Sequence, residues 1–332
     1  MHNRAEARPD IGFQVRRARL VFLGRVPSQR LVFYIQLGLS PLDMEPDLRI
    51  PVRDAVVTWL PARDINLRAG QMKVPFSRER VISSSALQFA DRSIVNEELS
   101  LDRDVGVQLF SNDLFGLGGR LGYQVGVFGG EGRNRVGPGP GLLYVARIQA
   151  QPFGRFDDAF EESALSRDPR PRLSVGASFA YNHEAQRSRS THGQFFDLGT
   201  FNLMHAEADL IFKAEGFSAQ AEVLGRWSQD DPIRVVANGA QRIEAPPNAI
   251  GFMGQAGYIF PLDLELAGRY AEVHPLGSPV RSSVNTLREM IGTFGWYGLN
   301  HDLKLQLDYA YLFRDRFADG DHLARVQFQL FF

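Results

Sequence analysis

Arginine and carboxylate side chains are closely interspersed in one segment of the chain, SRERVISSSALQFADRSIVNEELSLDR, which runs from Ser77 to Arg103. A guanidinium group presents a planar fork of donors that matches phosphate and carboxylate groups. In a narrow aqueous passage such charges are screened less than in bulk water, so they select which ions enter. Arg78, Arg80 and Arg92 therefore predict an anion-attracting segment. The alternative is that these arginines pair with neighbouring carboxylates and brace the segment against a wall.

The same segment reads as a long loop between two strands. Alternating residues at 65–74 and 104–110 predict the strands, and residues 77–102 between them show no clear period. A loop of this length inside a compact domain is uncommon unless it forms a lid, a binding segment or a constriction. Its apolar residues, such as Leu87 and Phe89, favour packing against a wall with the charges facing a lumen. A solvated loop over a small hydrophobic cluster is the alternative.

A catalytic site is suggested most strongly by His205, Glu207 and Asp209, which share one face of a predicted strand. A carboxylate there could orient the imidazole, and Ser218 on the next strand could lie nearby. A nucleophile would also need an oxyanion hole, and no motif in the sequence identifies one. The pattern therefore favours hydrated residues of a pore wall, and we predict no enzyme.

Metal and cofactor sites are not predicted either. The seven histidines are scattered, without the spacing of a zinc site on a helix or in a finger. Two acidic stretches, 43–47 and 228–232, could hold calcium through loop carboxylates, but neither matches an EF-hand loop.

Composition limits the class of protein. Lys plus Arg is 37 and Asp plus Glu is 38, so there is no basic excess with which to bind nucleic acid. Cysteine is absent, which excludes disulfides and thiolate chemistry. No apolar run is long enough for a transmembrane helix, so a membrane-spanning chain of this kind would have to form a closed barrel. Strand-like segments recur from end to end, so we predict a single domain over residues 1–332.

About fifteen strands are predicted, most of them at least nine residues long, which is the length that a tilted strand needs to cross a bilayer. They lie at residues 12–23, 30–39, 52–60, 65–74, 104–110, 119–129, 142–153, 172–183, 203–213, 217–227, 249–260, 262–273, 287–297, 303–312 and 323–332. Alternation alone fits a soluble sandwich equally well.

The connections favour an outer-membrane barrel, because tight turns alternate with long loops along the chain. One link, residues 154–171, breaks the rule, being long and acidic on the side of the short turns. The first and last strands must both run toward the short-turn, periplasmic side, so the visible count is odd, whereas single-chain bacterial barrels have even counts. We therefore expect a further strand before residue 1, with Met1 as a mistaken start or a fragment boundary.

Several stretches in the same order resemble the phosphate-selective porin O and P family. They are FQVRRARLVFLG, RDAVVTWLP followed by LRAGQMKVPFSRE, FADRSIVNEELSLDRDVGVQLF, LELAGRYAEV, and GLNHDLKLQLDYAYL with the terminal Phe332. The resemblance implies a sixteen-stranded, usually trimeric outer-membrane barrel that begins with one extra strand. It also implies that the loop at 77–102 folds inward as the constriction. Well-studied members carry a surplus of Arg and Lys along the pore, whereas this chain is nearly neutral.

We therefore predict an all-β, transmembrane antiparallel β-barrel in the bacterial outer membrane that passes small hydrophilic solutes, chiefly anions such as phosphate, and contacts membrane lipid. The predicted pore or anion-binding residues are Arg68, Lys73, Arg78, Arg80, Arg92, Arg103, Arg120, Arg147 and Arg269. The main alternative is a barrel with a plugged pore that anchors an envelope assembly through residues 155–170. An enzyme and a soluble sandwich are the remaining alternatives.

Overall fold

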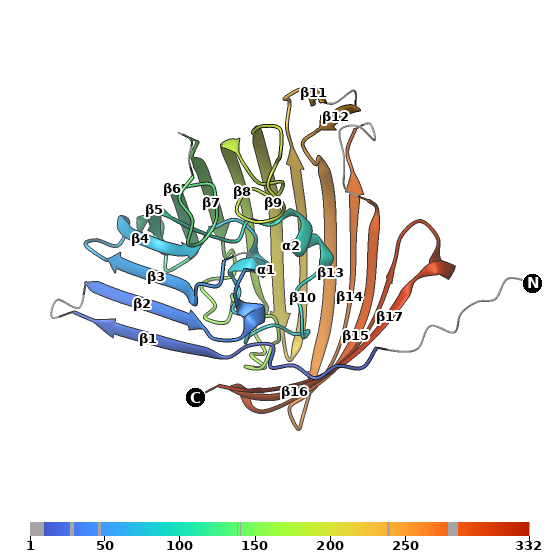
Figure 1. The fold of residues 1–332 in the computed structure, drawn as a ribbon. Helices are drawn as coiled ribbons and strands as arrows, with labels where there is room; N and C mark the ends of the chain where they lie inside the picture. The colour runs from blue at the N-terminus through green and yellow to red at the C-terminus, as the bar shows by residue number, and fades with distance from the viewer. Residues whose placement is uncertain are drawn as a thin grey trace, which may run out of the picture.

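One large antiparallel sheet forms most of the protein (Figure 1). The computed structural model describes residues 10–26, 30–45, 48–137, 139, 141–237, 240–277 and 285–331. Its strands are β1 (Arg19–Arg25), β2 (Leu31–Gly38), β3 (Val52–Trp59), β4 (Asn66–Lys73), β5 (Arg103–Ser111), β6 (Leu121–Phe128), β7 (Leu143–Ala150), β8 (Arg172–Ala185), β9 (Phe201–Ala214), β10 (Phe217–Trp227), β11 (Ile233–Ala237), β12 (Ala240–Glu244), β13 (Ala249–Phe260), β14 (Leu264–Pro275), β15 (Leu287–His301), β16 (Leu303–Phe313) and β17 (Asp321–Leu330). The helices are α1 (Arg78–Val81) and α2 (Ile94–Leu99), with 3-10 turns η1 (Pro41–Asp43), η2 (Leu114–Gly116) and η3 (Phe317–Asp319).

Fifteen strands pair in chain order, and β10 pairs with β13 because β11 and β12 form a separate hairpin. The predicted all-β, antiparallel architecture is confirmed. The hairpin within the loop after β10 was not predicted, and the first strand begins at Arg19 rather than at residue 12. Within the described residues no ladder joins β1 to β17, but Arg17 Nη1 donates to Gln327 Oε1 at 3.4 Å. The expected strand before residue 1 lies outside the described residues, as does Phe332.

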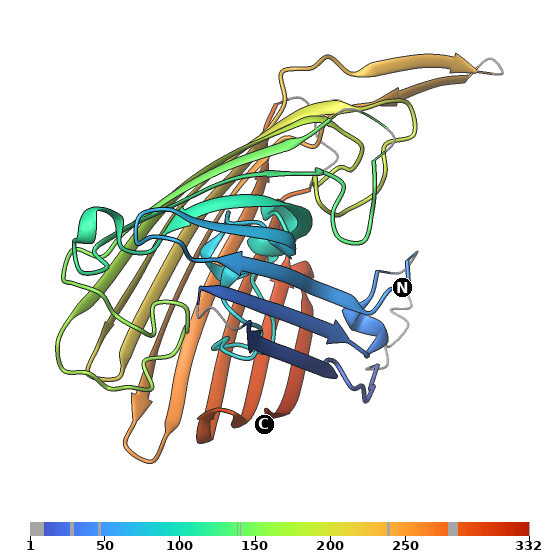
Figure 2. The same cartoon turned by 90° about the vertical axis from the view of Figure 1, so that its left-hand side faces the viewer.

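The two ends of the sheet differ as the connection lengths predict. Short turns such as the one between β9 and β10 close one end, and the long loops and the β11–β12 hairpin lie at the other (Figures 1 and 2). By the rule for outer-membrane barrels, the long loops face outward from the cell and the short turns face the periplasm.

Polar side chains face the inside of the curved sheet and apolar ones face outward, the reverse of a soluble protein. Along β13 buried and exposed residues alternate without exception. Its outward residues include Phe252 and Tyr258, which are 42% and 37% exposed, whereas inward Gln255 is 5% exposed. An apolar outer wall around a polar interior suits a barrel surrounded by lipid. None of the helices in the described residues has the length and apolar character needed to cross a membrane.

A charge on the outer wall should destabilise the protein strongly if lipid surrounds it. Phe294 lies midway along β15 and faces outward with 46% of its surface exposed. In lipid, Phe294→Arg should lower the free energy of unfolding by about 2–4 kcal/mol, and Phe294→Leu should lower it far less. Urea unfolding in lipid vesicles measures both. A loss within about 0.5 kcal/mol for Phe294→Arg would indicate a water-exposed surface instead.

Candidate functional site

The loop between β4 and β5 crosses the interior of the sheet. Ser77 and Ser93 are the N-cap residues of its two helices, and their hydroxyls accept hydrogen bonds from the backbone N–H of Arg80 and Asn96. Helix α2 contacts β10, β13, β14 and β15, far along the chain from β4. In both views the helices lie within the curve of the sheet (Figures 1 and 2).

An apolar cluster holds this loop against the wall. Val95 and Leu99 of α2 are fully buried in one cluster with Met253 and Val273 of the facing strands. A second cluster places Phe89 against strands β14, β15 and β16. The charged side chains of the loop therefore have to find partners or water inside the lumen.

Asp209 on β9 binds two of the predicted anion-binding arginines. Arg78 Nε donates to Asp209 Oδ1 at 2.5 Å, and Arg147 Nη2 donates to Oδ2 of the same carboxylate at 2.5 Å. Arg147 also pairs with Glu207 at 2.9 Å, and Arg78 donates to the hydroxyl of Ser174. Arg78 has no exposed surface, and Arg147 is 3% exposed. Arg78 thus braces the loop against the wall, and Arg147 on β7 donates to the carbonyl of Phe76, directly before the loop, at 2.7 Å.

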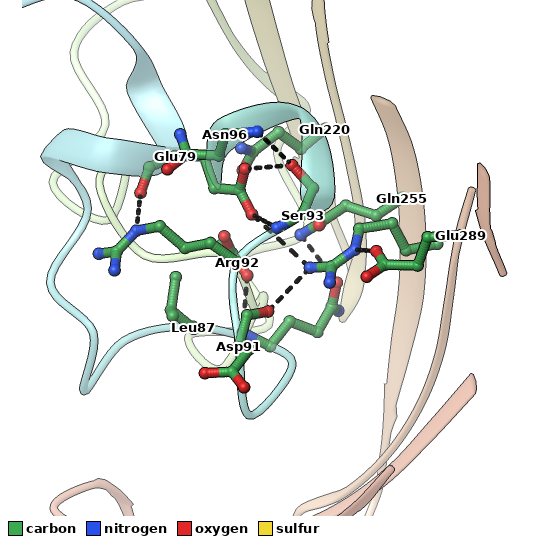
Figure 3. A network of polar contacts seen from close by, with 12 residues as sticks. Glu79, Leu87, Asp91, Arg92, Ser93, Asn96, Gln220, Gln255 and Glu289 are labelled. Carbon is green, nitrogen blue, oxygen red and sulfur yellow. Dashed lines mark hydrogen bonds and ion pairs between the residues drawn. The ribbon is translucent and has the colours of Figure 1, made fainter. Parts of the chain in front are cut away.

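A second ion network fixes the start of α2 (Figure 3). Glu79 accepts hydrogen bonds from both the backbone N–H and the hydroxyl of Ser93 at 2.7 Å. Arg269 on β14 lies between Glu79, at 3.6 Å, and Glu289 on β15, at 2.8 Å. It also donates to the backbone carbonyl of Asp91 at 3.0 Å. Arg269 is thus a brace as well.

The link at residues 155–170 is folded into the periplasmic end of the barrel, where it supports the loop from below. Glu162 is 2% exposed and accepts a hydrogen bond from the backbone N–H of Gln88 at 2.7 Å. Burial raises the pKa of Glu162 to about 7. Ser163 donates to Glu265 on β14, and Lys213 on β9 binds the link through Asp158 at 3.0 Å. Sequence reasoning gave no sign of this inward fold.

On the opposite side of the loop lies a cavity of about 460 Å³. Four predicted site residues line it, namely Arg68, Lys73, Arg92 and Arg103, together with Arg19 and Arg53. The only carboxylate in its described lining is that of Asp54. The structure thus gathers six cations around one cavity.

These six cations fall into two groups. Arg103 forms a two-pronged pair with Asp54, each contact at 3.0 Å, and both Arg19 and Arg53 pair with Asp43.

The other three contact neutral groups. Arg68 donates to the hydroxyl of Thr58 at 3.3 Å and lies 4.8 Å from the ring centre of Phe110. Lys73 donates to the carbonyls of residues 81 and 82, both at 2.9 Å, and Arg92 donates to those of residues 79 and 82. Across the described part of the chain, none of the three forms an ion pair with a carboxylate. Burial lowers the pKa of Arg92 to about 9, so it remains a cation at neutral pH.

Comparison with known proteins identifies the family. Residues 3–332 match the family described as phosphate-selective porin O and P. The chain belongs to this family. Proteins of this family reside in the bacterial outer membrane. The family and the fold together indicate a channel rather than an enzyme. No curated protein matches the chain.

Solved structures with the same fold include several outer-membrane proteins at low identity. OmpF of Salmonella typhi, in complex with daunomycin, is 15% identical over 90% of this chain and 84% of its own, with a TM-score of 0.56. The channel DcaP of Acinetobacter baumannii is 14% identical over 93% and 82%, with a TM-score of 0.52. An anion-selective porin from Comamonas acidovorans is 12% identical over 90% and 78%, with a TM-score of 0.50. At these identities the likeness shows the fold alone.

The two remaining predicted site residues of the porin also lie outside the cavity. Arg80 pairs with Asp102 at 2.5 Å. Burial alone would raise the pKa of Asp102, but Arg80 and Arg103 hold it well below its usual range. Arg120 is exposed at the start of β6 near the periplasmic rim, where it donates to the carbonyl of Pro152 at 3.0 Å.

Sequence reasoning missed two arginines of the cavity, for different reasons. Arg19 lies on β1, where the apolar run from Leu20 to Leu23 gives no alternation that could have singled it out. Arg53 lies at a register shift, because Gln36 pairs with Asp54 whereas Leu37 pairs with Val52. This bulge adds one residue to β3, so the side chain of Arg53 faces the cavity although regular alternation would place it on the outer face.

The cluster that the sequence suggested for catalysis, His205, Glu207 and Asp209, helps instead to hold the wall and the loops together. His205 is fully buried and shares a hydrogen bond of 2.8 Å with Ser190 on an outer loop, while Glu207 and Asp209 both bind Arg147. Among the described residues, no group of three or more His, Asp or Glu side chains is placed to hold a metal ion.

Removing the shared carboxylate should release the inward loop. Asp209→Ala leaves two buried guanidinium groups without their main partner, so the free energy of unfolding should fall by about 3–5 kcal/mol. Arg242→Ala, which breaks the exposed pair with Asp197, serves as the control and should leave stability unchanged. Tryptophan fluorescence during urea unfolding measures both. Equal stability of the two variants would contradict the bracing role of Asp209.

Proposed function

We propose that this porin passes small anions, with phosphate-like oxyanions as the main class, through the cavity between the inward loop and strands β1–β5. The observation that carries the proposal is the set of Arg68, Lys73 and Arg92. These three cations line the cavity and contact only neutral groups among the described residues. Their charge is therefore available to a solute, whereas that of Arg78, Arg147 and Arg269 is neutralised by the wall.

Confinement makes these charges effective. A cavity with low-dielectric walls focuses the field of its lining charges and raises the local concentration of counter-ions. A channel also needs sites weak enough to let the ion leave. Contacts with hydroxyls and carbonyls hold the three side chains in place without cancelling their charge, so they attract an anion without forming a closed binding site.

The inward loop acts as the constriction in this proposal, and its braces determine where the passage runs. Helix α2 packs against β10, β13, β14 and β15, and the link at residues 155–170 lies against the loop on its periplasmic side. Both contacts close the space between the loop and that part of the wall. A passing solute is thereby directed toward the basic wall. The overall neutral charge of the chain is compatible with this selectivity, because most inward carboxylates are engaged by bracing cations.

Selectivity should follow the three unneutralised cations. Arg68→Gln should move the reversal potential in a planar bilayer under a salt gradient toward zero, and Arg68→Gln combined with Lys73→Gln and Arg92→Gln should abolish the anion preference. Arg120→Gln at the periplasmic rim is the matched control and should behave as the wild-type protein. Cation selectivity of the wild type, or no effect of the triple change, would contradict the proposal. A complete lack of conductance would favour the anchoring barrel.

We also propose that the porin is a homotrimer, on the strength of its family resemblance. Size-exclusion chromatography with light scattering in detergent should give three copies per particle, with the mass of the bound detergent subtracted. A monomeric particle at several protein concentrations would contradict this.

A further inference from the structure

A groove of about 680 Å³ runs along the outer wall of the barrel over β14–β17. Its floor is formed by Gly268 and Gly292, which lie directly opposite each other on β14 and β15. A Cβ added at Gly292 would meet no atom within 4 Å, and one at Gly268 would meet only a backbone oxygen at 3.9 Å. The missing side chains therefore leave open space on the outer face.

Aromatic residues form the walls of this groove toward its extracellular end. Tyr309 pairs with Gly292 across the ladder, and the rings of Tyr311 and Phe317 lie 5.0 Å apart at the extracellular turn. The hydroxyl of Tyr309 shares a hydrogen bond of 2.6 Å with His322 Nδ1, and that of Tyr311 donates to the carbonyl of Phe317. Because these polar atoms are already paired, the groove offers an apolar lining.

We propose that this groove holds an acyl chain of a lipid from the outer leaflet. The groove is continuous with the outward apolar face that the barrel presents to lipid, and it extends from the extracellular turn toward the middle of the strands. Its volume lies within the range of about 300–1,000 Å³ typical of sites for small organic ligands. Aromatic rings with polar tips at its upper end suit the interface between acyl chains and headgroups.

A lipid chain fits the shape better than a second copy of the porin does. The outer face of a barrel is convex, so a second barrel would meet this wall only along a narrow strip, whereas a lipid chain can follow the groove along its length. A single flexible chain can lie along the floor and contact both walls, which allows the dispersion contacts that an empty groove forgoes. The proposal is independent of ion selectivity, because the groove lies on the opposite face of the sheet from the cavity.

Filling the groove should displace the lipid without changing the pore. Purified, delipidated porin is titrated with lipid A in detergent, and native mass spectrometry gives the dissociation constant of the tightest lipid adduct. Gly292→Leu, and Gly268→Leu as a second variant, should raise this constant about tenfold, the equivalent of roughly two lost methylene contacts. Gly254→Leu is the matched control, because Gly254 also faces outward with open space around its Cβ site but does not line the groove.

Three results would overturn the proposal. One is equal lipid affinity in all variants, and another is the same loss in the Gly254→Leu control. The third is a change of oligomeric state in Gly292→Leu with lipid affinity unchanged, since that would identify the groove as a contact between subunits.

Discussion

Charge neutralisation across the lumen is the constraint on which the remaining structure depends. The inward loop can be held in place only if its buried charges meet opposite charges on the wall, because a buried and unpaired guanidinium is strongly destabilising. Asp209 on the wall pairs with Arg78 of the loop and with Arg147 of the wall, and Arg269 on the wall pairs with Glu79 of the loop and with Glu289. With these pairs in place, the apolar face of α2 packs against the far wall.

This bracing divides the interior into two unlike halves. In one half, strands β8–β16 together with the loop and the link at 155–170 form a packed core of ion pairs and apolar contacts. In the other half, strands β1–β5 border a cavity in which cations outnumber carboxylates. The loop therefore fills the half of the interior beside β8–β16 and leaves the basic wall of the cavity beside β1–β5 uncovered. Selectivity can thus arise in a chain whose net charge is −1.

Much of the fold could be predicted from the sequence, because strand alternation and connection length are local properties. All fifteen strands of the sheet were found in this way, and so was the loop between β4 and β5. The roles of individual arginines could not be predicted equally well. Arg78 and Arg92 look alike in the sequence, but one faces a carboxylate 131 residues away and the other faces backbone carbonyls of its own loop. Such pairing depends on the curvature of the whole sheet, which brings distant strands to face one another, and the inward turn of Arg53 depends on a register shift.

In this porin, only cations without a carboxylate partner should be available to passing anions. Anomalous diffraction from crystals soaked in bromide tests this, because it locates bound anions atom by atom. We expect bromide peaks within the cavity beside Arg68, Lys73 and Arg92, and none beside Arg78, Arg147 or Arg269. Peaks at the braced arginines, with the cavity empty, would contradict it.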